Sequence, residues 1–191
     1  MSSGSAAPIF VPEEVLRKGL GSNEVRFWAD RGAKDPELYS RIIHIACYDD
    51  GIMGTKAAWI VSHMADQAPD LATAHFNLIL KSLGNAEGGR LRELFKVLLL
   101  GWKTEKQYSS CLDWSFKLIS DLSKEIAVMH AAKGFLEQAC RRYPELIDEV
   151  ELHLEAVSQL HGRPWQEQVR KTRERLQKLR LKPSGNKKGT R

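Results

Sequence analysis

The chain has 191 residues, of which 42% are hydrophobic and 28% are charged, and its formal net charge is +5. This is a globular composition with enough apolar residues for a real core. We expect neither a secretory signal, because residues 1–12 lack a basic segment and a long apolar run, nor a membrane span, because no apolar window is long enough. Three widely spaced cysteines, Cys47, Cys111 and Cys140, predict buried thiols in a reducing compartment, hence a cytoplasmic protein.

The charge is unevenly distributed along the chain. Residues 162–191 contain eleven Lys or Arg and two acids, which is a net charge of +9. The whole chain carries +5, so the other 161 residues carry −4. The sequence therefore predicts a mildly acidic body with a basic C-terminal end.

Helices are expected throughout, because apolar residues recur at helical spacing and no clear alternation with a period of two is present. Residues 1–11 are rich in Ser, Ala and Gly and are expected to form a flexible tail. Two short helices are predicted next, over residues 12–20 and 23–31, separated by Gly21 and Ser22.

Two aspartates are candidate caps in the next part of the chain. Asp35 is expected to cap a helix whose first residue is Pro36 and which ends near Asp49. Asp50 is expected to cap the following helix, which runs to about Gln67.

A proline corner organises the middle of the chain. Because the residue before a proline avoids the α region, one helix should end near Gln67 and a second should run from Pro69 to Leu83, where Gly84 stops it. Trp59 lies beside a small Ala-Ala pair on the first of these helices. We predict that it is buried between consecutive repeats.

The second half contains five further predicted helices, of which the first three are as follows. Gly88 and Gly89 are assigned to a connection, and residues 91–102 form the most apolar helix. Thr104 and Gln107 have capping-box spacing at the start of the next one. Ser123 is expected to cap its successor.

The last helices follow two more proline corners. Tyr143-Pro144 resembles Ala68-Pro69, and Pro164 begins a long basic helix. On that helix we predict an apolar seam that docks on the preceding hairpin, formed by four residues: Trp165, Val169, Leu176 and Leu179.

The predicted helices repeat at a regular spacing. The second helix of each pair begins near residues 50, 87, 124 and 163, and Pro69 aligns with Pro144 at an offset of 75, about two periods. Paired helices at such a period are the signature of a solenoid. The alternative is a helical bundle without repeats.

Two segments carry a family resemblance, Lys-Ala-Ala-Trp-Ile-Val-x-His from Lys56 and Ala-Pro-Asp-Leu from Ala68. They resemble HEAT-like repeat proteins, and more narrowly a group of small bacterial HEAT-like proteins of unknown function. The resemblance implies an all-α, short right-handed α-solenoid of antiparallel helical hairpins. We expect a single domain over residues 12–181, followed by a basic flexible tail over 182–191.

No motif predicts an enzyme, a cofactor or a metal site. Two pairs of potential metal ligands lie at helical spacing, His63 with Asp66 and Glu149 with His153, and neither pair has an identifiable third ligand. No phosphate-binding glycine loop and no nucleophile elbow occurs.

A DNA glycosylase of the alkylation-repair type, built on a HEAT-like fold, is an alternative reading. Trp59, Trp102 and Trp114 could line a cavity with Asp113, as aromatic residues and an acid do in such enzymes. The match is one of residue class only, and the acidic body does not predict the basic groove that DNA requires. Tryptophans at helical spacing are more often core residues.

The basic C-terminal helix is the candidate binding surface. Lys171, Arg175, Lys178 and Lys182 follow one face, and Arg170 lies on a neighbouring face. These cations could follow phosphates, or they could form the solvated outer surface that a terminal repeat needs. Acids on the preceding hairpin should hold the helix partly in place: Glu145, Asp148, Glu149, Glu151 and Glu155.

The function predicted from the sequence is that of a non-catalytic scaffold, which binds a protein or peptide partner on its concave face. The alternative is a nucleic-acid-binding protein that uses the basic helix. The proline and tryptophan positions Trp59, Pro69, Pro144 and Trp165 are assigned structural roles.

Overall fold

The structure is a computed structural model that describes residues 12–121 and 123–181. The two predicted tails, residues 1–11 and 182–191, lie outside the described residues. The chain divides into two compact units, Met1–Lys103 and Thr104–Arg191. The single domain predicted over residues 12–181 stays a prediction.

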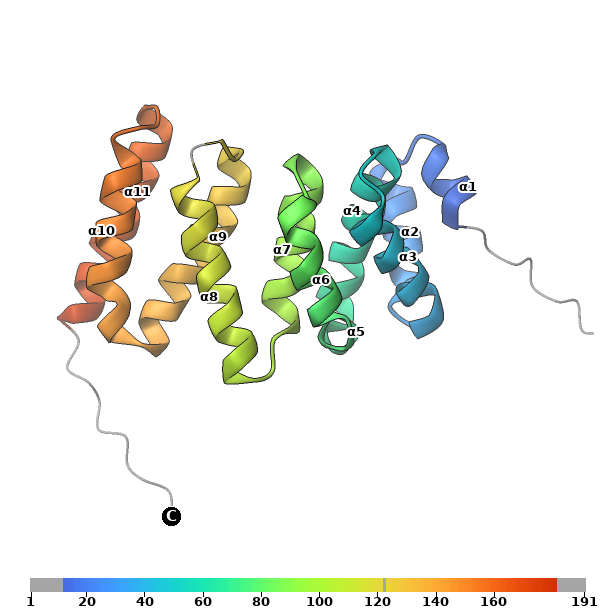
Figure 1. The fold of residues 1–191 in the computed structure, drawn as a ribbon, viewed down its shortest axis with the longest axis horizontal. Helices are drawn as coiled ribbons and strands as arrows, with labels where there is room; N and C mark the ends of the chain where they lie inside the picture. The colour runs from blue at the N-terminus through green and yellow to red at the C-terminus, as the bar shows by residue number, and fades with distance from the viewer. Residues whose placement is uncertain (1–11, 122, 182–191) are drawn as a thin grey trace, which may run out of the picture. The chain divides into compact units, whose positions relative to one another are not determined.

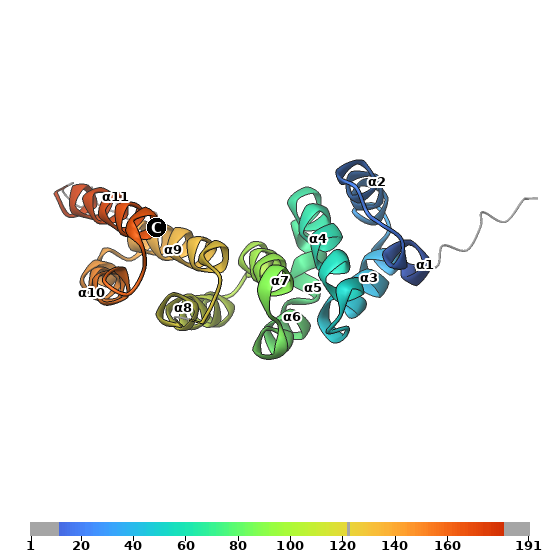
Figure 2. The same ribbon diagram turned by 90° about the horizontal axis from the view of Figure 1, so that it is seen from above.

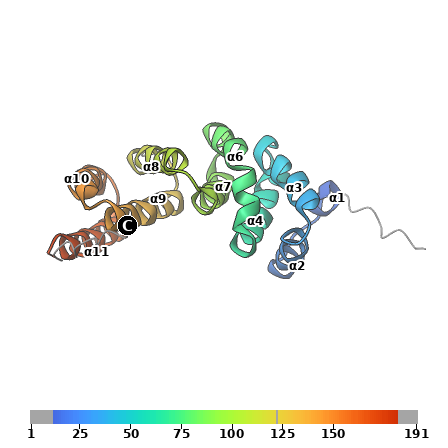
Figure 3. The same cartoon turned by 90° about the horizontal axis from the view of Figure 1, so that it is seen from below.

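Unit 1 is built from helices in two layers. Its elements are α1 (Pro12–Arg17), α2 (Ser22–Gly32), α3 (Pro36–Tyr48), α4 (Ile52–Gln67), α5 (Pro69–Ala74), α6 (Phe76–Ser82), the short 3-10 helix η1 (Leu83–Asn85) and α7 (Gly88–Gly101). Helices α2, α4 and α7 lie in one layer, and α3 and α6 lie in the other (Figures 2 and 3). The buried apolar faces of the two layers meet in the core of the unit.

Two aspartates, one before α3 and one after it, show how local sequence sets the helix ends. Asp35 caps α3 as predicted, since its Oδ1 accepts from the backbone N–H of Glu37 and Leu38. The expectation that Asp50 caps α4 is wrong. Asp49 Oδ1 accepts from Gly51 and Gly54 instead, because the chain folds back so tightly that Asp49 reaches the first turn of α4.

The helix predicted from Pro69 to Leu83 is interrupted at His75. The ring Nδ1 of His75 lies 3.0 Å from the Leu71 carbonyl oxygen, the group to which the His75 N–H would donate in a continuous helix. That N–H donates to Ala72 instead. The side chain therefore competes with the backbone, and two short helices, α5 and α6, replace one long one.

Gly88 and Gly89 begin α7 rather than forming a connection, so this prediction is wrong. Gly88 has a φ of 50°, a left-handed conformation that glycine adopts without steric cost. Gly89 follows it in the first turn. The rest of α7 is the buried, apolar helix that was expected.

Unit 2 contains two antiparallel helix pairs, seen in Figure 1. Its elements are α8 (Glu105–Ser120), α9 (Ile126–Arg142), the 3-10 helix η2 (Pro144–Leu146), α10 (Ile147–Ser158) and α11 (Arg163–Arg180). Helices α9 and α11 form one layer and α8 and α10 the other (Figure 2). An apolar cluster contributed by all four helices forms the core of this unit.

Two predicted caps of unit 2 have different outcomes. The capping box of α8 is confirmed, since Gln107 N–H donates to Thr104 Oγ1 and Thr104 N–H donates to Gln107 Oε1. The cap proposed for Ser123 is wrong, because Glu125 precedes α9. Ser123 instead donates from its N–H and its hydroxyl to Asp121, which stabilises the turn before the helix.

The two proline corners have nearly the same conformation. Ala68 has φ and ψ of −137° and 71°, and Tyr143 has −130° and 82°. The hydrogen bond from each of these residues to the carbonyl four positions earlier is 2.8 Å long in both corners. Pro69 and Pro144 therefore occupy equivalent positions, as the offset of 75 predicts, each as the first residue of a new helical segment.

The spacing of the repeats is visible in the helix starts and in the contacts between helices. Helices α4, α7, α9 and α11 begin at Ile52, Gly88, Ile126 and Arg163, which are 36, 38 and 37 residues apart. Side-chain hydrogen bonds join residues at the same separation, such as Asp30 with Gln67, 37 residues apart. Within a unit, residues one period apart in sequence are thus neighbours on adjacent helices.

The prediction that Trp59 is buried is wrong. Its side chain is half-buried, whereas Ala57, Ala58 and Ile60 are buried. Trp59 shares a helix face with the half-buried His63, whose ring centroid lies 6.3 Å from its own. The small alanines, not the indole, face the neighbouring helices and allow them to approach closely.

Candidate functional site

The apolar seam of α11 packs against the other helices of unit 2, as predicted. Trp165, Val169 and Leu176 are buried in the core of the unit, and Leu179 is partly buried against it. The Trp165 ring lies 5.2 Å from the His130 ring and 6.0 Å from the His161 ring, measured between centroids. Its Nε1 is buried and has no hydrogen-bond partner among the described residues. The apolar contact therefore anchors the helix.

Three arginines of α11 bind carboxylates of neighbouring helices. Arg175 donates to both oxygens of Glu137 on α9, at 2.7 and 2.8 Å. Arg173 pairs with Glu155, and Arg180 pairs with Asp148 and Glu151, all on α10. The hairpin acids were expected to contribute, and three of the five do. Glu137 was not predicted from the sequence.

Two other cations of the helix, Arg170 and Lys171, are paired within it. Arg170 binds Glu167 and Glu174, one turn away on either side, and Lys171 lies 3.4 Å from Glu167. Hydrogen bonding from Arg170 lowers the pKa of the Glu167 carboxyl to about 2. Lys178 is exposed and has no ion pair with a described residue, and Lys182 lies outside the described residues.

A buried polar network joins α9 to α11 beneath these pairs. The Lys133 ammonium, almost fully buried, donates to the Thr172 hydroxyl at 3.1 Å, and burial lowers the pKa of this lysine. Burial acts to raise the pKa of Glu137, but the hydrogen bond from Arg175 and the nearby positive charges outweigh it, so the pKa is lowered. Glu137 is thus ionised at neutral pH and balances the positive charges around it.

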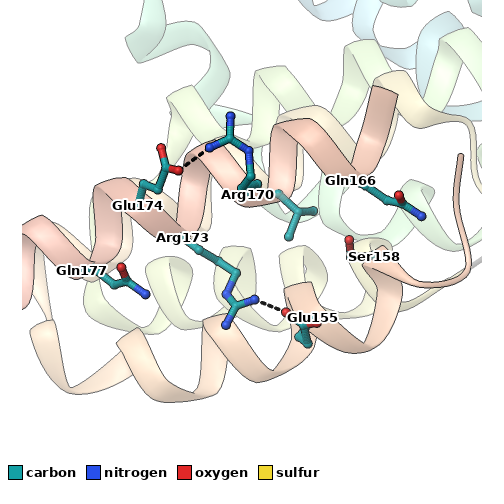
Figure 4. Close-up of a pocket in the computed structure, with 8 residues that line it drawn as sticks. Glu155, Ser158, Gln166, Arg170, Arg173, Glu174 and Gln177 are labelled. Atoms are coloured by element: carbon teal, nitrogen blue, oxygen red, sulfur yellow. Dashed lines mark hydrogen bonds and ion pairs between the residues drawn. The ribbon is translucent and has the colours of Figure 1, made fainter. Parts of the chain in front are cut away.

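A polar groove lies between α10 and α11. It has a volume of about 320 Å³ and is lined by Glu155, Ser158, Gln166, Val169, Arg170, Arg173, Glu174 and Gln177. Figure 4 shows Arg173 reaching from α11 to Glu155 on α10, while Arg170 is paired with Glu174 along the helix. Both arginines that line the groove are therefore paired with carboxylates of the same unit rather than free.

Neither unit alone contains the four residues proposed for a glycosylase. Trp59 and Trp102 belong to unit 1, and Asp113 and Trp114 belong to unit 2. Trp114 is half-buried and its ring contacts the Lys117 ammonium, 4.5 Å from the ring centroid. These tryptophans therefore do not define a cavity within either unit.

The candidate metal pairs do not gain a third ligand in the described part of the chain, where no group of three or more His, Cys, Asp or Glu could hold a metal ion. His153 lies 3.2 Å from the Ser120 hydroxyl and packs on Phe116. The three cysteines are buried and free, as predicted. Burial raises the pKa of Cys111 to about 12 and that of Cys140 to about 11, so both are unreactive thiols at neutral pH.

The geometry defines the class of protein as an all-α repeat protein built from paired antiparallel helices. A family model for the HEAT repeat domain matches residues 13–178, and the chain belongs to that family. The all-α solenoid fold predicted from the sequence is thereby confirmed. No curated protein and no solved structure matches the chain. Among the described residues, no helix is long and apolar enough to cross a membrane.

Proposed function

We propose that this chain is a non-catalytic helical-repeat scaffold that binds a protein or peptide partner. HEAT repeats often mediate protein interactions, and this membership supports the proposal. The observation that carries it against the nucleic-acid alternative is the pairing of the α11 arginines with carboxylates of the same unit. A phosphate would have to compete with these carboxylates for each guanidinium.

The four candidate residues that lie on α11 illustrate this competition. Arg170, Lys171 and Arg175 all have carboxylate partners, so they contribute little net positive potential at the surface. Lys178 is exposed and is the one described member of the set without an ion pair to a described residue. Counterion release scales with the number of phosphates neutralised, and one lysine supplies only a small part of that free energy.

The proposal places the protein in the cytoplasm of a bacterial cell and requires no cofactor. Support for the cytoplasm comes from three sparse, buried cysteines, which suit a reducing compartment. Support for a bacterial origin comes from the resemblance of the Lys56 and Ala68 segments to small bacterial HEAT-like proteins.

The test is photo-crosslinking in the native host, followed by measurement of the purified pair. A photoreactive amino acid replaces Gln138 on α9 or Lys178 on α11, both exposed in the same helix layer, and Asp113 on α8 as a position in the other layer. We expect a protein crosslink from at least one position. When that protein is titrated against the purified chain, we expect saturable binding with a measurable dissociation constant. Crosslinks to nucleic acid alone would contradict the proposal.

A further inference from the structure

A small pocket lies where the start of α8 meets the corner between α9 and α10. It has a volume of about 200 Å³, and its lining is mostly apolar and aromatic with acids at the edge: Glu105, Tyr108, Ser109, Leu112, Tyr143, Glu145 and Leu146. All of these residues belong to unit 2. This set, the tyrosine pocket, is separate from the groove between α10 and α11.

The walls and edge of the tyrosine pocket differ in character. The rings of Tyr108 and Tyr143 lie 5.7 Å apart between centroids, and their planes are inclined at 56°. Leu112 and Leu146 are half-buried and supply the apolar wall. The carboxylate of Glu145 is exposed and has no ion pair with a described residue. The pocket therefore offers aromatic and apolar surface next to an available negative charge.

The protein already holds one guanidinium on this surface. The Cζ atom of Arg142 lies 4.9 Å from the Tyr108 ring centroid and 5.2 Å from that of Tyr143, and its Nη2 binds Glu105. The Tyr143 hydroxyl donates to the other Glu105 oxygen at 2.7 Å. Two tyrosine rings and a carboxylate thus already bind an arginine side chain, which shows the chemistry that this surface accepts.

We propose that the tyrosine pocket binds an arginine side chain of the partner peptide, an inference that rests on the proposed function and specifies the class of partner. The arginine stem would pack on Leu112 and Leu146, and its guanidinium would donate to Glu145 at the edge. Arginine suits the site better than lysine, because its planar group binds a carboxylate through two hydrogen bonds and stacks on aromatic rings. Apolar residues beside the arginine would cover the rest of the wall.

The chain's own basic residues are the competing occupant. Lys182, Lys187, Lys188 and Arg191 lie beyond the described residues. Arg180, just before them, binds Asp148 on α10, the helix that follows Glu145 and Leu146. The experiment must therefore separate a partner arginine from these residues.

The test uses backbone amide NMR of the full chain with a defined probe. The probe is the capped peptide Gly-Ser-Leu-Arg-Leu-Ser-Gly, and the control peptide carries Gln in place of Arg. We expect saturable shifts of the amides of Ser109, Leu112 and Leu146 with the arginine peptide and none with the glutamine peptide. No shifts at millimolar arginine peptide, or equal shifts with both, would overturn the inference.

Matched variants separate this pocket from general attraction to the acidic α10. Glu145→Gln removes the available carboxylate and should weaken binding at least fivefold. Glu149→Gln removes the same charge from an exposed position of α10 outside the pocket, and should change the dissociation constant less than twofold. Equal weakening by both variants would show non-specific charge attraction and reject the site.

Two further results identify the occupant of the tyrosine pocket and distinguish failure of this inference from failure of the proposed function. If replacing Lys182, Lys187, Lys188 and Arg191 with Gln shifts the pocket amides without any peptide, the chain's own end is the occupant and the inference fails. A crosslinked partner whose affinity is unchanged by Glu145→Gln would also reject the pocket, while leaving the scaffold function intact. Failure to find any protein partner rejects the scaffold function itself.

Discussion

Glycine positions reveal where backbone segments approach most closely. A Cβ built on Gly54, in the first turn of α4, would lie 1.8 Å from the Asp49 carbonyl oxygen. A Cβ on Gly134, inside α9, would meet no atom within 4 Å. Gly54 is thus required by the tight turn between α3 and α4, whereas Gly134 weakens its helix without a packing reason.

We predict opposite effects for the same substitution at these two positions. Gly54→Ala should lower the free energy of unfolding by about 2 kcal/mol or more, because the Asp49 backbone must move. Gly134→Ala should raise it by about 0.5–1 kcal/mol through helix propensity. Urea denaturation followed by circular dichroism measures both. A neutral Gly54→Ala would contradict the close approach seen in the turn.

Tryptophans in unit 2 differ in burial, which sets their contributions to stability. Trp165 is 1% exposed, and Trp114 is half-buried. Trp165→Ala should cost about 3–5 kcal/mol, the range for a buried aromatic residue. Trp114→Ala should cost clearly less, and so should Trp59→Ala in unit 1, because Trp59 is also half-buried. Equal denaturation midpoints for Trp165→Ala and Trp114→Ala would contradict this assignment of the core.

The Glu137 carboxylate should make stability depend on pH. Its pKa in the folded protein lies below the ordinary 4.5, so its stabilising contribution is fully present above about pH 4.5 and is lost as the pH falls through the folded value. Glu137→Gln should cost roughly 1–3 kcal/mol at pH 7, and the difference from the natural protein should shrink below pH 4.5.

The control for Glu137 is Glu149→Gln, which removes an exposed acid without an ion pair among the described residues. It should change stability by less than about 0.5 kcal/mol at either pH. If the free energy of unfolding of Glu137→Gln had the same pH dependence as that of the natural protein, the ion pair between Glu137 and Arg175 would not contribute to stability.

At the scale of elements, helix α11 shows an apolar seam and a charged face with different roles. Leu176 is fully buried in the core of unit 2, while Lys171 and Lys178 are exposed. We predict that Leu176→Asp destabilises the docking of α11 severely, because it buries a charge without a partner. The double change of Lys171 and Lys178 to Gln should alter stability by about 0.5 kcal/mol or less.

Adding Arg175→Gln to the lysine pair separates surface charge from internal pairing. Glu137 is largely buried and would lose both of its hydrogen bonds from Arg175. The triple variant should therefore be less stable than the double variant, as measured by thermal unfolding. Identical midpoints for the double and triple variants would mean that the Arg175 pair is only a surface contact.

Sequence alone predicts the elements best where a short motif sets the local backbone. Thr104 and Gln107 satisfy nearby backbone groups, and each proline restricts the backbone of the residue before it, so both effects are local and were predicted. The break at His75 depends on whether the His75 ring or the His75 backbone N–H forms the hydrogen bond to the Leu71 carbonyl oxygen. The propensity of neighbouring residues contains no signal for that choice.

The contacts of the candidate site depend on the register between helices. Glu137 was missed because its partner Arg175 is 38 residues away and on another helix. The repeat period supplies a signal for such pairs, since Lys133 with Thr172 and Arg142 with Glu105 are separated by 39 and 37 residues. The repeat period therefore indicates residues about 37–39 positions apart as candidate partners.

At the scale of the whole molecule, the basic C-terminal end is the feature whose role decides between the two candidate functions. The sequence shows eleven cations among residues 162–191, which suggests a phosphate-binding surface. Within unit 2, four of the five described arginines of this segment are instead paired with carboxylates: Arg170, Arg173, Arg175 and Arg180. The helix thus stabilises its own unit, and the central claim is that it does not recognise nucleic acid.

Titration of the full chain with labelled duplex DNA across a range of salt concentrations tests this claim most directly. We predict no saturable binding at 150 mM salt, and no change in any residual low-salt binding when Lys171 and Lys178 are replaced by Gln. A salt slope of about −0.9 per phosphate contact accompanies true backbone binding. Binding that persists at 150 mM salt, and whose slope becomes shallower by about two contacts in the double variant, would contradict the account.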